Sequence, residues 1–187
     1  FDSDNSCSCE DGHDCCADHC TASAGPIMQH DADATKTLEF LGNPPDGVYF
    51  GVELEVEPRK RVAAGSALAQ HVLDTMSRDV ICKHDGSLGD GGFEIVTAPA
   101  TLNEHRRMWA KFFDSPVTAK LISWASGNCG MHVHITRPKS AYITGKMLVF
   151  VNAAENYAFM VAIAGRDAST WAKLHPEKKL TDARNRG

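Results

Sequence analysis

Polar and apolar residues alternate without exception from Val52 to Glu57. Successive side chains of a β-strand point to opposite faces, so this alternation predicts a strand with one apolar and one polar face. The apolar face carries Val52, Leu54 and Val56, and the polar face carries Glu53, Glu55 and Glu57. Carboxylates spaced about 7 Å apart along one strand repel each other. The polar face is therefore either solvated or a binding site for cations.

Similar patterns predict the other elements of the chain. Further strands are predicted at 80–84, 93–98 and 130–136, and helices at 63–78, at 102–113, from 115 onward and at 140–164. The resulting order is β-α-β-β-α-α-β-α, with two consecutive strands in its middle. This order favours an α+β domain with a mostly antiparallel sheet and packed helices.

Local signals mark several helix ends. Thr101 and Glu104 have the spacing of a capping box at the start of the helix at 102–113. Ser115 suits the N-cap of the next helix and Pro116 its first position. Gly165 is suited to the left-handed residue that ends the long helix at 140–164.

The first thirty residues differ in composition from the rest of the chain. Residues 1–30 contain few apolar residues and five of the seven cysteines, residues 31–46 form a polar, turn-rich linker, and residues 47–187 form the predicted domain. A segment with so little apolar surface cannot bury a core. Clustered cysteines and histidines could fold around zinc, a thiol-rich tail without metal being the alternative. The candidate zinc ligands are Cys7, Cys9, Cys15, Cys16, His19 and Cys20.

Composition narrows the functional classes. The 187 residues are 43% hydrophobic and 23% charged, which suits a globular domain with a core of its own. A net charge of −5 gives no general attraction to nucleic acid or to anionic membranes, so neither is expected as a partner. No apolar run reaches membrane-spanning length. Cys82 and Cys129 lie among apolar residues as single thiols, which favours a reducing compartment and a cytoplasmic protein.

Three predicted strands carry acids or imidazoles opposite an apolar face. His132 and His134 share one face of the strand at 130–136, Glu94 alternates with apolar neighbours, and Asp85 begins a glycine-rich turn. Each residue alone has an ordinary structural explanation, such as an Asx turn for Asp85. Together with the glutamates of 50–57, they predict one shared polar cavity. Carboxylate oxygens suit magnesium, and magnesium accompanies nucleotide phosphates.

The same motifs carry a resemblance to a known family. Phe-Gly-Val-Glu-Leu-Glu from Phe50, Asp-Gly-Ser-Leu from Asp85, Gly-Phe-Glu-Ile-Val-Thr-Ala-Pro from Gly92 and Cys-Gly-Met-His-Val-His from Cys129 resemble the amidoligase family. These proteins are carboxylate–amine ligases related to glutamate–cysteine ligase and glutamine synthetase. The resemblance covers roughly residues 47–175.

The resemblance implies a glutamine synthetase-like funnel and an ATP-dependent ligase. Glu53, Glu55, Glu94 and His132 would bind Mg²⁺, Asp85 and His134 would line the cavity, and Arg166 would hold the phosphates of ATP. A small-molecule or peptide carboxylate would be activated as an acyl phosphate, which an amine then captures to form an amide or isopeptide bond. Family members carry a later strand with a Glu-x-Arg motif. This chain reaches Gly187 without one, as expected either of a fragment or of a domain shortened at its C-terminus.

Two other functions are consistent with the sequence. The domain could be an inactive ligase-like module of a larger assembly, contacted through the Cys-rich segment. His132-Val133-His134 also matches the His-hydrophobe-His motif of metal-dependent nicking endonucleases, for which Tyr142 or Tyr157 would be the nucleophile. The second alternative leaves the glutamates unexplained, and the chain lacks a basic stripe for DNA.

Overall fold

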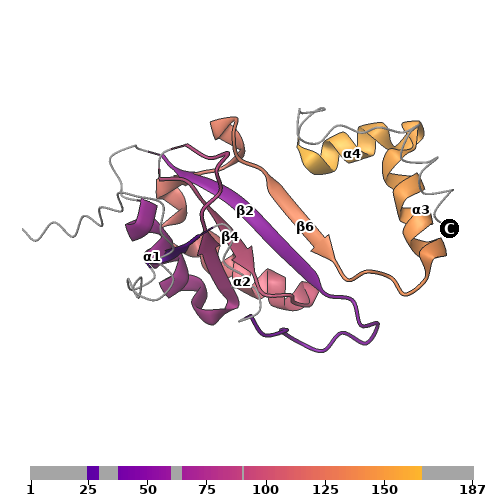
Figure 1. Ribbon diagram of the computed structural model, residues 1–187, viewed down its shortest axis with the longest axis horizontal. Helices are drawn as coiled ribbons and strands as arrows, with labels where there is room; N and C mark the ends of the chain where they lie inside the picture. Colours follow the sequence, from indigo (N-terminus) through magenta and orange to yellow (C-terminus); the bar gives the residue numbers. More distant parts are fainter. Residues whose placement is uncertain (1–24, 30–37, 60–64, 90, 166–187) are drawn as a thin grey trace, which may run out of the picture. The chain divides into compact units, whose positions relative to one another are not determined.

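Strand β2 (Phe50–Pro58) pairs with three other strands in the sheet of the computed structural model (Figure 1). The structure describes residues 25–29, 38–59, 65–89 and 91–165. Within them the strand order is β1-β3-β4-β2-β5, and β6 also pairs with β2. All of these pairings are antiparallel except that of β1 with β3. The predicted combination of helices with a mostly antiparallel sheet is thus confirmed.

The chain divides into two compact units, Phe1–Ile135 and Thr136–Gly187. Among the residues that the structure describes, the sheet and the helices α1 and α2 belong to the first unit. The elements of this unit, in chain order, are β1 (Ile27–Met28), β2, α1 (Gly65–Met76), β3 (Val80–Lys83), β4 (Phe93–Thr97), α2 (Leu102–Asp114), β5 (Leu121–Ile122) and β6 (Met131–Ile135). The three further strands predicted from alternation are confirmed to within a residue or so at each end.

The two-residue strands β1 and β5 were not predicted. Ile27 and Met28 of β1 lie opposite Cys82 and Lys83, and Ile27 packs against the core. The last residues of the segment 1–30 therefore contribute to the sheet of the first unit. A pair of residues is too short for an alternation pattern to reveal, which is why sequence periodicity missed both strands.

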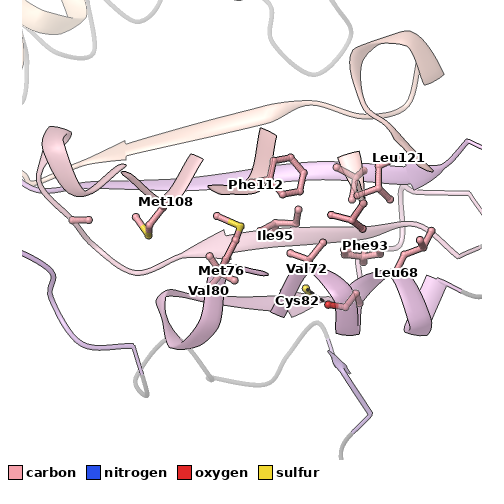
Figure 2. Close-up of a cluster of buried hydrophobic side chains, with 14 residues drawn as sticks. Leu68, Val72, Met76, Val80, Cys82, Phe93, Ile95, Met108, Phe112 and Leu121 are labelled. Atoms are coloured by element: carbon pink, nitrogen blue, oxygen red, sulfur yellow. Dashed lines mark hydrogen bonds between the residues drawn. The ribbon is translucent and has the colours of Figure 1, made fainter. Parts of the chain in front are cut away.

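A cluster of buried apolar side chains joins the sheet to helices α1 and α2 (Figure 2). Phe93 and Ile95 of β4 are fully buried in this cluster. Helix α1 contributes Leu68, Val72 and Met76, and helix α2 contributes Met108 and Phe112. The core therefore lies on the face of the sheet opposite Glu53 and Glu55, as the alternation of β2 requires.

The start of α2 follows the predicted capping signal. The Thr101 hydroxyl accepts a hydrogen bond from the Glu104 backbone N–H at 3.3 Å. The carboxylate of Glu104 instead binds Arg107 at 2.7 Å, and Arg107 also binds Asp79 at 3.0 Å. The threonine half of the capping box is thus present.

The helix predicted from Ser115 onward does not form. Ser115 has an extended backbone with ψ of 142° and ends α2, and the chain then makes a 3₁₀ turn at Thr118–Lys120 before β5. The Thr118 hydroxyl donates to the backbone carbonyl of Phe112, which closes the end of α2. Leu121 is buried beside Pro58, so burial of this side chain holds the segment in the sheet.

Where one long helix was predicted, the described part of the second unit contains two α-helices. Helices α3 (Ala141–Asn152) and α4 (Tyr157–Ala164) are separated by a short 3₁₀ turn, and the chain bends by 62° between them. Ala153 is extended with ψ of 133°, which interrupts the helical backbone. The Asn156 side chain donates to the Phe150 carbonyl at 2.8 Å and occupies an acceptor released by the break. Gly165 has the predicted left-handed conformation, with φ of 68°.

Helices α3 and α4 are apolar over most of their length. Within the described residues, no single helix has the length and apolar character needed to cross a membrane. Taken together as a bent pair, Ala141–Asn152 and Ala154–Ala164 meet those two criteria.

Candidate functional site

The polar face of the sheet collects side chains from β2, β3, β4 and β6. Directly opposed residues of antiparallel strands point to the same face, so register decides which side chains meet. Glu53 lies opposite Val96 of β4 and His132 of β6, and Glu55 lies opposite Glu94 of β4. The structure thus brings Glu53 together with His132, which lies 79 positions further along the sequence.

Glu53 contacts both histidines of β6. Its Oε2 atom lies 3.1 Å from Nδ1 of His132, and its Oε1 atom lies 3.2 Å from Nε2 of His134. The Glu53 side chain is 29% exposed, while the two imidazoles are more than half exposed. The predicted convergence of Glu53 with the two histidines is confirmed by these distances.

The environment of Glu53 acts on its pKa in two directions. Partial burial raises the pKa of Glu53, because it disfavours the charged form. Hydrogen bonds and favourable charge interactions with His132 and His134 outweigh burial, so that the pKa is lowered overall. Glu53 is therefore ionised at neutral pH.

Removing both imidazoles should reverse this shift. In a His132→Ala/His134→Ala variant, burial is the remaining influence, so we expect the pKa of Glu53 to rise above that of the wild type. A carboxylate with a lowered folded-state pKa stabilises the fold above its unfolded pKa, about 4.3, and loses that contribution as pH falls through the folded pKa. NMR titration of the side-chain carboxyl carbon measures the shift.

His71→Ala is a suitable control for this titration. His71 is an exposed residue of α1, outside the contacts of Glu53. Its replacement should leave the Glu53 titration unchanged. An unaltered Glu53 pKa in the double variant would contradict the assigned role of the two imidazoles.

Glu55 and Glu94 form a second, more buried part of the polar face. The two residues are 8% and 7% exposed and lie directly opposite each other. The Glu55 carboxylate accepts a hydrogen bond from the backbone N–H of Gly130. The Glu94 carboxylate lies 3.7 Å from the Lys83 ammonium. Two opposed carboxylates repel, and the N–H group and the ammonium offset part of that repulsion.

Lys83 and Gly130 were not identified from the sequence as parts of the site. Lys83 lies opposite Glu94 in the β3–β4 pairing. The alternation of β3 could have placed Lys83 on a polar face, but the register of β3 with β4 was needed to pair it with Glu94. No side-chain pattern identifies Gly130, since its contribution is a backbone N–H.

Asp85 is engaged within its own turn. Its Oδ1 atom accepts hydrogen bonds from the backbone N–H of Ser87 at 2.6 Å and from the Ser87 hydroxyl. This is the Asx turn expected for the residue. The neighbouring Gly89 N–H donates to Glu57 at 2.8 Å, which attaches the turn to β2. A role for Asp85 in the cavity stays a prediction.

Several predicted residues lie outside the described part of the chain. They are Arg166 and the candidate zinc ligands Cys7, Cys9, Cys15, Cys16, His19 and Cys20. Tyr142 belongs to α3 and Tyr157 begins α4, both in the second unit.

Cys82 and Cys129 are buried free thiols, as predicted. Burial raises the pKa of Cys82 to about 12. Burial likewise raises the pKa of Cys129. Both thiols are therefore protonated at neutral pH and are poor nucleophiles.

A pocket lies beside Glu53 on the polar face. It has a volume of about 240 Å³ and opens to solvent. Its lining consists of Leu38, Gly51, Val52, Glu53, Val96, Thr97, Pro99 and His134. Sequence reasoning missed this pocket, because it exists where Gly51, opposite His134, has no side chain.

Comparisons with protein-family models, with curated proteins and with solved structures found no match to this chain. Among the described residues, no three His, Cys, Asp or Glu side chains form a ready-made metal site. A magnesium site does not need three protein ligands, because Mg²⁺ commonly binds one or two protein carboxylates together with water and substrate phosphates.

Proposed function

We propose that this protein is an ATP- and Mg²⁺-dependent carboxylate–amine ligase that uses the polar face of β2, β4 and β6. The observation that carries the proposal is the grouping of Glu53, Glu55 and Glu94 on one face, with His132 and His134 against Glu53. A DNA-cleaving site would leave the opposed Glu55 and Glu94 without a role.

The donor chemistry of this face fits magnesium. Glu55 and Glu94 place two carboxylates opposite each other, and a bound cation would offset the repulsion between them. Glu53, with its Oε2 atom on the side of His132, is the third carboxylate donor. When bound, Mg²⁺ would neutralise negative charge on the phosphates of ATP.

The residues of the face would orient two substrates and move a proton. The substrate carboxylate attacks the γ-phosphorus, and the bond from phosphorus to ADP breaks. The amine nitrogen then attacks the acyl carbon, and inorganic phosphate leaves with the electron pair of the carbon–oxygen bond. The ammonium form of the amine must lose a proton before this attack. His134 at the rim of the face is the group suited to accept it.

Two further parts of the proposal concern residues outside the described ranges. Arg166 would bind the phosphates of ATP, for which a guanidinium is well suited. The candidate zinc ligands would hold one Zn²⁺ and give the N-terminal segment a surface for a larger assembly. A glutamine synthetase-like funnel would complete the cavity around the sheet.

A reducing compartment such as the cytoplasm suits the free thiols of Cys82 and Cys129.

The proposal predicts nucleotide binding that depends on magnesium. Isothermal calorimetry should detect ATP binding with Mg²⁺ and much weaker binding without it, because the carboxylates of the face repel free phosphates. Phosphate release should accelerate when a carboxylate and an amine are supplied together. Absence of Mg²⁺-dependent ATP binding to the full chain would overturn the proposal.

One observation favours a second candidate, a metal-dependent nicking endonuclease. His132 and His134 flank a carboxylate of a neighbouring strand, and imidazoles and carboxylates are ligand types of catalytic divalent metals, although these three side chains form no ready-made metal site. This enzyme would form a covalent adduct between single-stranded DNA and Tyr142 or Tyr157. Denaturing electrophoresis of the wild type and of Tyr142→Phe and Tyr157→Phe variants with labelled DNA tests it.

A further inference from the structure

We infer that the pocket beside Glu53 binds the amine substrate, and that this substrate is a primary aliphatic amine with a short branched or linear chain. The inference rests on the proposed ligase function, which does not itself specify the amine. It concerns the Oε1 side of Glu53, where His134 lies, and not the Oε2 side proposed for magnesium.

The charge of the pocket selects a cationic head group. Glu53 lines the pocket and places its carboxylate there beside His134. The described lining residues include no lysine or arginine that could hold an anion. A carboxylate can accept about four hydrogen bonds, and the two imidazoles use one each. Glu53 can therefore still accept bonds from an ammonium group.

The walls of the pocket select an aliphatic body. Leu38, Val96 and Pro99 present apolar surface next to the charged end. The Thr97 hydroxyl already accepts the backbone N–H of Val52 at 2.9 Å, which reduces its availability to a ligand. A polar substrate body would thus lose hydrogen bonds to water without regaining them, whereas an aliphatic chain gains from burial.

The volume limits the length of that chain. Pockets for drug-sized ligands enclose about 300–1,000 Å³. The pocket beside Glu53 encloses about 240 Å³ and is open on one side. It therefore suits a head group with a few carbon atoms, and a larger amine would extend into solvent.

Gly51 provides a way to fill the pocket without disturbing the strand. A Cβ atom at Gly51 would lie 3.6 Å from the Cβ of His134, an ordinary van der Waals contact. Gly51 has no positive φ, so a β-branched residue is compatible with its strand backbone. Gly51→Val should thus occupy the pocket while the sheet is retained.

Binding of isoamylamine to the full chain, without ATP or metal, tests the inference. In ¹H–¹⁵N NMR titrations, isoamylamine should shift the amide signals of Gly51, Val52 and Thr97 in the wild type. Gly51→Val should raise its dissociation constant by about 10-fold or more, as expected when a few carbon atoms are excluded from an apolar pocket. Gly145→Ala, at an α3 position with open space around it, should bind like the wild type.

Two comparison ligands separate charge from shape. Isovalerate has nearly the same body with a negative head group and should bind at least 10-fold more weakly, since it faces the Glu53 carboxylate. Methylamine has the ammonium without the chain and should also bind more weakly. The inference is overturned if isovalerate binds as well as isoamylamine, or if Gly51→Val leaves isoamylamine binding unchanged while its spectrum shows an intact fold.

The outcome can be separated from that of the proposed function. Isoamylamine binding at Gly51, Val52 and Thr97 without any Mg²⁺-dependent ATP binding would support the pocket and reject the ligase. Mg²⁺-dependent ATP turnover in a protein that does not bind isoamylamine would support the ligase and reject this amine site.

Discussion

Replacement of Phe93 by alanine is expected to lower the free energy of unfolding of the first unit by about 3–5 kcal/mol. Phe93 of β4 is fully buried and belongs to the cluster that joins the sheet to α1 (Figure 2). Truncation loses the burial of the ring and leaves a cavity that the packed neighbours cannot fill completely. Since small domains are stable by about 5–15 kcal/mol, this loss is a large share of the total.

Urea unfolding followed by tryptophan fluorescence measures the effect, because Trp109 packs against the same cluster. Phe113→Ala is the matched control. Phe113 lies near the end of α2, is 62% exposed and touches the ring of Trp109 at a centroid distance of 6.0 Å. Phe113→Ala should lower the free energy of unfolding by about 1 kcal/mol or less. Equal losses for Phe93→Ala and Phe113→Ala would show that the cluster does not carry the stability of the unit.

The position of Phe93 in the core was predictable, since strand alternation is a local property. In β2 and β4, polar and apolar residues alternate, so the polar residues mark one face of the sheet and their apolar neighbours the other. Glu53 and Glu94 lie on the polar face, and the apolar residues between the acids therefore face the helices. The same reasoning placed His132 and His134 on one face of β6. It could not pair them with Glu53, because register between strands far apart in sequence depends on tertiary contacts.

The break between α3 and α4 shows a different limit. Most residues from Ala141 to Ala164 are apolar, so their periodicity continues across the break with no change. The break is instead marked by two polar residues that bind nearby backbone carbonyls. Asn152 donates to the Leu148 carbonyl at 2.8 Å, and Asn156 donates to the Phe150 carbonyl. Such side-chain to backbone bonds compete with the helix and favour its interruption.

The pocket beside Glu53 was hidden for a third reason. A pocket is produced by a missing side chain, and the sequence around Gly51 shows a glycine in a strand without showing which side chains surround it. Its role depends on His134 and Val96 lying on either side of β2, which the register determines. Sequence patterns therefore identified the acids and imidazoles of the polar face but not the space between them.

Glu53→Gln is expected to reduce Mg²⁺-dependent ATP turnover by about 100-fold or more, in line with the loss of one charged group at a site where phosphate charge is stabilised. The substitution keeps the size of the side chain and removes the charge that faces both imidazoles. It thus removes one proposed magnesium ligand and the anion that would hold the amine. Phosphate release under saturating Mg²⁺ and ATP, compared at equal protein concentration, measures the effect.

Glu57→Gln is the matched control, because Glu57 occupies the same face of β2 and binds the turn at Gly89 instead of a histidine. It should keep turnover within about 2-fold of the wild type, since it leaves the groups around Glu53 in place. If Glu57→Gln were as inactive as Glu53→Gln, general loss of negative charge on the face would explain both results. If Glu53→Gln kept full turnover, the ligase would have to use Glu55 and Glu94 alone. Loss of turnover in Glu53→Gln with unchanged urea unfolding would instead locate the chemistry at the contact of Glu53 with His132 and His134.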